Sequence, residues 1–152
     1  MKKILTLAAF SFLAFGSRFE VFAHCEIPCG IYDDHMRVHM IEEHCTTIEK
    51  GMDEIIKLTY STQEGGHTSR DVNQLVRWTM NKEHHAEQIQ EIVSQYFLTQ
   101  RIKPETENYQ KKLELLHGIL LSAMKAKQTT DKAHVEKIRS LLAEFSKLYF
   151  KE

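Results

Sequence analysis

The chain has 152 residues, of which 20 are basic and 21 acidic, so its formal net charge is -1. This length suits one domain, or one domain preceded by a removable segment, and a hydrophobic content of 42% is enough for a buried core. The nearly balanced charge lacks the basic stripe typical of nucleic-acid-binding proteins, so we expect no nucleic-acid partner.

Residues 1–23 have the composition of an export signal. Two lysines precede an uncharged, mostly apolar run from Ile4 to Gly16. This run is too short to cross a bilayer as a helix, but it has the length of a signal-peptide core. Small residues then lead to a possible cleavage site after Ala23, while an uncleaved anchor or a core helix is the alternative. Removal by a leader peptidase would leave an exported domain, residues 24–152, without stable membrane insertion, in the periplasm or outside the cell.

The rest of the chain is predicted to form four helices with short connections. Apolar residues recur at helical spacing over about residues 34–58, 69–99 and 107–127, and again from Asp131 to Leu148. We expect an all-α fold, an antiparallel four-helix bundle with an irregular N-terminal hook. The predicted core-facing residues are Ile41, Ile48, Met52 and Ile55; Val72, Leu75, Val76, Met80, Ile89, Ile92, Val93 and Tyr96; Leu113, Leu116, Leu120 and Met124; and Val135, Ile138, Leu141, Leu142, Phe145 and Leu148.

Polar residues and glycines predict where the helices begin and end. Asp33 or Asp34 can cap the first helix, and Asp131 can cap the fourth. Gly65-Gly66 marks the first turn, and Pro104 ends the second helical segment.

The hook, residues 24–32, reads His-Cys-Glu-Ile-Pro-Cys-Gly-Ile-Tyr and fits no helix pattern. Its proline and glycine predict a turn-rich loop that can bring the sulfurs of Cys25 and Cys29 to one point. Cleavage after Ala23 would give His24 a free α-amine beside its imidazole. Two nitrogens and two sulfurs in one plane suit Ni(II) or Cu(II), whereas structural zinc sites are usually tetrahedral. The spacing alone also allows a Cys25–Cys29 disulfide in an exported protein.

The hook closely resembles the pattern H-C-x-x-P-C-G-x-Y, with which mature nickel-containing superoxide dismutases begin. The likeness continues through Asp33 and the first helix and returns around Gln95-Tyr96-Phe97. It covers most of the mature chain, and the hook is its most specific part.

The resemblance implies a role for each matching residue. The amine of His24, the backbone nitrogen and thiolate of Cys25 and the thiolate of Cys29 would bind nickel in a plane. The His24 imidazole would bind axially in the oxidised state. Tyr32 would stand over the open axial face, and Tyr96 would be a second tyrosine near the site. The substrate would be superoxide, converted to dioxygen and hydrogen peroxide by one nickel ion per subunit that alternates between Ni(II) and Ni(III), in a homohexamer.

The sequence departs from the family pattern in the residues expected to support the axial imidazole. Glu42 or Glu43 could supply an acidic partner. Where the resemblance leads us to expect an arginine on the second helix, the chain has Asn81, with Arg77 one turn earlier. Such orienting partners commonly change metal affinity or activity by about 10–100-fold.

Other metal-binding patterns are weaker. His35 and His39 are four residues apart, but we expect them to be solvated. Glu114 and His117 have the Glu-x-x-His spacing of di-iron bundles without a second copy. A third cysteine, Cys45, is predicted to be a buried structural thiol, with a link to another chain as the alternative.

Two other functions remain compatible with the residues. One is an exported metal-binding or metal-delivery protein that uses the hook without turnover, and the other is a disulfide-bonded helical interaction module. A cytoplasmic location, after leader removal by a dedicated protease, is the alternative to export.

Overall fold

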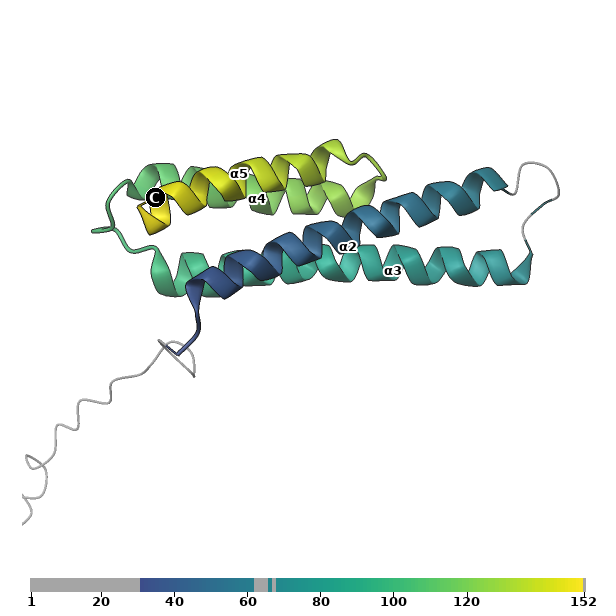
Figure 1. Cartoon of the computed structure of the whole chain (residues 1–152), viewed down its shortest axis with the longest axis horizontal. Helices are drawn as coiled ribbons and strands as arrows, with labels where there is room; N and C mark the ends of the chain where they lie inside the picture. Colours follow the sequence, from purple (N-terminus) through teal and green to yellow (C-terminus); the bar gives the residue numbers. More distant parts are fainter. Residues whose placement is uncertain (1–30, 62–65, 67, 152) are drawn as a thin grey trace, which may run out of the picture.

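The computed structural model describes residues 31–61, 66 and 68–151 of the chain (Figure 1). This part is helical and contains no strand, which confirms the all-α fold. Its elements are α2 (Asp34–Ser61), α3 (Ser69–Glu91), the π-helix η1 (Ile92–Arg101), α4 (Tyr109–Gln128) and α5 (Ala133–Phe150).

The helices form an antiparallel four-helix bundle, as predicted. Helix α2 packs along α3 and α4 along α5, while contacts of α3 with α4 and of α2 with α5 close the ring (Figure 1). The α2–α3 hairpin is longer than the α4–α5 pair and extends past it at the end where α3 begins. None of the helices described is long and apolar enough to span a bilayer.

The predicted second helix is not α-helical over its whole length. From Ile92 it continues as η1, in which the backbone amide of Ile102 donates to the Phe97 carbonyl, 2.9 Å away and five residues earlier. This wider turn is rare and occurs frequently at functional sites. The third helix begins at Tyr109, two residues later than predicted, because Asn108 is left-handed with φ 55°.

Side chains cap three of the helices. The Asp33 carboxylate accepts the amides of His35 and Met36, so Asp33 rather than Asp34 caps α2. The predicted cap at Asp131 is confirmed, since its carboxylate accepts the Ala133 amide at 2.9 Å. Thr68 forms a capping box with the third residue of α3.

The predicted core is largely confirmed, with two exceptions, which are Met124 near the end of α4, 40% exposed, and the start of α3. Val72, Val76 and Met80 were predicted to be buried, yet they are 49%, 52% and 67% exposed. They precede the point where α4 ends against α3, so the second pair of helices does not cover them. The fully buried side chains include Ile41, Ile48, Met52, Ile89, Val93, Phe97, Leu116, Ile119, Ile138 and Phe145.

Cys45 is a free, fully buried cysteine in the core, which confirms its predicted structural role. Burial raises the pKa of its thiol to about 12. The side chain is therefore a neutral thiol at physiological pH.

Candidate active site

The predicted metal ligands His24, Cys25 and Cys29 lie outside the described residues, so their roles stay predictions. The described chain begins at Ile31, and only the last two residues of the hook belong to it. These two residues show where the hook meets the bundle.

The two predicted site tyrosines lie together at this junction. Tyr32 lies two residues before the start of α2, and Tyr96 lies in η1, 64 residues later. Their ring centroids are 6.1 Å apart in an edge-to-face arrangement, and the Tyr96 hydroxyl is 3.2 Å from the Tyr32 carbonyl oxygen. Tyr96 is buried, whereas Tyr32 is 41% exposed. The pair therefore combines the buried ring of Tyr96 with the accessible ring of Tyr32.

Asp34, at the start of α2, joins three elements around this pair. Its carboxylate accepts hydrogen bonds from the hydroxyl of Tyr96, from Tyr149 of α5 at 2.6 Å, and from Arg101 Nε at 3.0 Å. Arg101 also donates to the Tyr96 hydroxyl oxygen at 2.8 Å. We call Asp34, Tyr96, Arg101 and Tyr149 the anchor cluster. It ties the first residue of α2 to η1 and α5.

The anchor cluster sets the protonation of its own members. Burial alone would raise the pKa of Asp34, but the hydroxyls of Tyr149 and Tyr96 and the charge of Arg101 together lower it. Burial and the Asp34 carboxylate raise the pKa of both tyrosines. At neutral pH the cluster therefore holds an ionised carboxylate and two protonated hydroxyls.

A second arginine covers the tyrosine rings. The guanidinium carbon of Arg37 lies 4.1 Å from the centroid of the Tyr32 ring and 5.3 Å from that of Tyr96. Both distances are in the range of a cation–π contact. Arg37 lies one turn into α2, so it faces the same junction.

The candidate acidic partners of the axial imidazole are both engaged elsewhere. Glu42 accepts from Arg139 Nε of α5 at 3.1 Å, and Glu43 lies 3.5 Å from His39 on the exposed surface. Neither side chain contacts Tyr32 or Tyr96 in the described structure.

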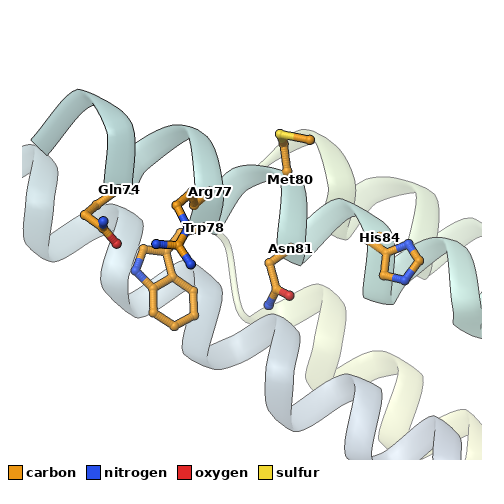
Figure 2. A pocket seen from close by; sticks show the side chains of 6 residues that line it. All are labelled: Gln74, Arg77, Trp78, Met80, Asn81 and His84. Atoms are coloured by element: carbon orange, nitrogen blue, oxygen red, sulfur yellow. The ribbon is translucent and has the colours of Figure 1, made fainter. Parts of the chain in front are cut away.

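Arg77 and Asn81 lie far from the tyrosine pair. Asn81 is 15 residues before Tyr96 on the α3–η1 segment, which corresponds to roughly 22 Å along the axis of an α-helix. Both line an open cavity of about 690 Å³ on α3, together with Gln74, Trp78, Met80 and His84 (Figure 2). Within one chain they do not reach the junction at Tyr32.

The histidines in the described part of the chain form no obvious metal site. His35 stacks on Phe150, with ring centroids 3.7 Å apart, and Glu114 and His117 are exposed. His44 and His85 face each other across α2 and α3, with their Nδ1 atoms 2.8 Å apart. No group of three or more His, Cys, Asp or Glu side chains among the described residues is arranged to hold a metal ion.

Sequence reasoning missed most of the anchor cluster. Asp34 was considered only as a helix cap, and Arg101 and Tyr149 were not candidates. Tyr149 lies four residues after Phe145, so the apolar stripe of α5 signals its half-buried position. No pattern in the sequence shows that its hydroxyl meets the start of α2, because that contact joins residues 115 positions apart.

The fold and the anchor cluster together define an all-α bundle in which two tyrosines lie side by side where the chain enters α2. The family model of nickel-containing superoxide dismutase matches residues 19–152. The chain therefore belongs to this family, which makes it an oxidoreductase acting on superoxide, as the hook sequence predicted. No curated protein and no solved structure matches the chain.

Proposed function

We propose that the mature protein begins at His24 and dismutates superoxide at one nickel ion per subunit, bound by His24, Cys25 and Cys29. The observation that carries this proposal is the family match, which includes the entire hook. The donor set of an amine, a backbone nitrogen and two thiolates fits nickel, since these ligands favour a planar site.

The state of the third cysteine supports this assignment. The chain has three cysteines, and a thiol must lose its proton to become a good metal ligand. Cys45 is buried with a pKa of about 12, so it does not compete as a thiolate. Cys25 and Cys29 remain as the sulfur donors.

Bound nickel would supply a one-electron couple between Ni(II) and Ni(III). Two superoxide anions and two protons give one dioxygen and one hydrogen peroxide. The chain's own residues govern access and orientation: the accessible Tyr32 ring restricts the approach to the end of the hook. Tyr96, held by the anchor cluster, packs edge-to-face against Tyr32 and holds that ring where the chain enters α2.

We further propose that the protein is exported by its leader and assembles as a homohexamer. The apolar composition of residues 4–16 supports export. Exposed apolar side chains on α3, namely Val72, Val76 and Met80, support burial against another subunit. Cell fractionation tests the location, and light scattering tests the subunit number.

The test is a comparison of two proteins that differ by one residue. The first begins at His24, and the second retains Ala23 before it, so that only the free α-amine of His24 is lost. Both are refolded with nickel and assayed for superoxide consumption. We expect the Ala23-retaining protein to lose more activity than the roughly 10–100-fold that is typically lost when a residue that only orients a metal ligand is replaced. Equal activity of the two, or full activity with zinc alone, would overturn the proposal.

A further inference from the structure

The charges around the tyrosine pair are not all neutralised. Two guanidinium groups face the Tyr96 ring, with Arg101 at 4.7 Å and Arg37 at 5.3 Å from its centroid. Arg101 is paired with the Asp34 carboxylate, so the two charges largely cancel. Arg37 differs, because no carboxylate of the described residues lies within ion-pair distance of it.

The surroundings of Arg37 hold it in place without cancelling its charge. Its guanidinium lies over the Tyr32 ring, and its Nη1 is 3.5 Å from the sulfur of Met40. Asp33, the acidic residue one turn earlier, uses its carboxylate to accept two amides of the α2 cap. The result is a half-buried cation beside the accessible tyrosine.

The overall charge of the protein makes a local positive charge important for attracting superoxide. The full chain has a net charge of -1, and the leader carries three of its basic residues and one acidic residue. Its removal therefore makes the mature chain more negative. A negative protein repels superoxide, which is an anion, so attraction must come from local positive charge. Positive charge beside a binding site raises the association rate of an anionic substrate.

We propose that Arg37 is a steering residue, whose charge draws superoxide to the Tyr32 side of the site. This inference rests on the proposed function, because it takes superoxide as the substrate and the junction at Tyr32 as its approach. It assigns Arg37 a role in approach only, without contact to the reacting atoms.

The test measures kcat/KM for superoxide by pulse radiolysis at several ionic strengths. At about 10 mM salt the Debye length is about 30 Å, and at 1 M it is about 3 Å. High salt therefore screens the long-range attraction between Arg37 and superoxide. We expect Arg37→Gln to lower kcat/KM about three- to tenfold at low salt. We expect the difference from the unmodified protein to disappear at high salt.

Two further variants separate charge from structure. Arg37→Lys keeps the charge but loses the flat stacking surface, and it should retain most of the rate and its salt dependence. Arg70→Gln removes the same charge at the exposed start of α3, which lies at the far end of the hairpin from Arg37 (Figure 1). This control should leave kcat/KM unchanged.

The outcomes distinguish this inference from the proposed function. Nickel content and the nickel electron paramagnetic resonance spectrum should be the same in all variants, since steering does not touch the metal. A loss in Arg37→Gln that is equal at low and high salt would overturn the steering role, as would an equal loss in Arg70→Gln or no loss at all. Absence of activity in the unmodified nickel-loaded protein would instead overturn the proposed function.

Discussion

Replacing Asp34 by alanine is expected to destabilise the protein and release both tyrosines of the anchor cluster. The carboxylate accepts hydrogen bonds from two tyrosine hydroxyls and one guanidinium. Hydrogen bonds to charged groups contribute about 1.5–3 kcal/mol each, but exposed pairs contribute only about 0–1 kcal/mol. The Asp34 side chain is 27% exposed and that of Arg101 19%, so water replaces part of what is lost. We expect a decrease in the free energy of unfolding of about 2–4 kcal/mol.

The assay is urea denaturation followed by circular dichroism, together with spectroscopic titration of the tyrosines. Loss of the carboxylate should lower the pKa of Tyr96 and Tyr149 toward the ordinary value of 10.0. Glu49→Ala is the matched control. Glu49 lies on another part of α2, its side chain is 26% exposed, and it pairs with Arg139 of α5. The control should lose stability without changing the titration. If Asp34→Ala lost less than about 0.5 kcal/mol, the change would resemble an ordinary surface substitution and the reasoning would be wrong.

Two further predictions concern the packing of α3. Lys82 is 3% exposed and donates to the carbonyls of Ala126 and Lys127 at 2.8 and 2.6 Å. Lys82→Met would leave these two carbonyls at the end of α4 unpaired. We expect urea denaturation to show a decrease in the free energy of unfolding of about 2–4 kcal/mol. Burial, followed by the charge of a neighbouring histidine, lowers the pKa of both His44 and His85 below 6.5. The unfolded chain therefore binds protons first as the pH falls, and stability should decrease below about pH 6.5, by up to about 1.4 kcal/mol per pH unit for each histidine. His85→Asn should flatten this dependence, and an unchanged slope would contradict the assignment.

The sequence was sufficient for the helices because their signals are local. Apolar spacing and the cap at Asp131 each depend on residues a few positions apart. The exposed start of α3 could not be predicted, because Val72 and Val76 follow the same spacing as buried residues. Their exposure depends on where α4 ends, which is a long-range property of the fold.

The candidate site was likewise predicted only in part. Tyr32 and Tyr96 were predicted from a resemblance to a family pattern, and the structure places their rings 6.1 Å apart. Asp34, Arg101 and Tyr149 of the anchor cluster, and Arg37 beside it, were not predicted as site residues, because their partners come from α2, η1 and α5. The π-helical turn that contains Tyr96 also has no clear sequence signature, since Ile92 to Arg101 continue the apolar spacing of an ordinary helix.

Intact-mass measurement of the purified, active protein under native conditions tests the nickel hook most directly. The proposed chelate requires a free amino group on His24, so the active subunit should have the mass of residues 24–152 plus one nickel ion. An active, nickel-bound subunit that still carried residues upstream of His24 would contradict the chelate and the redox site built on it.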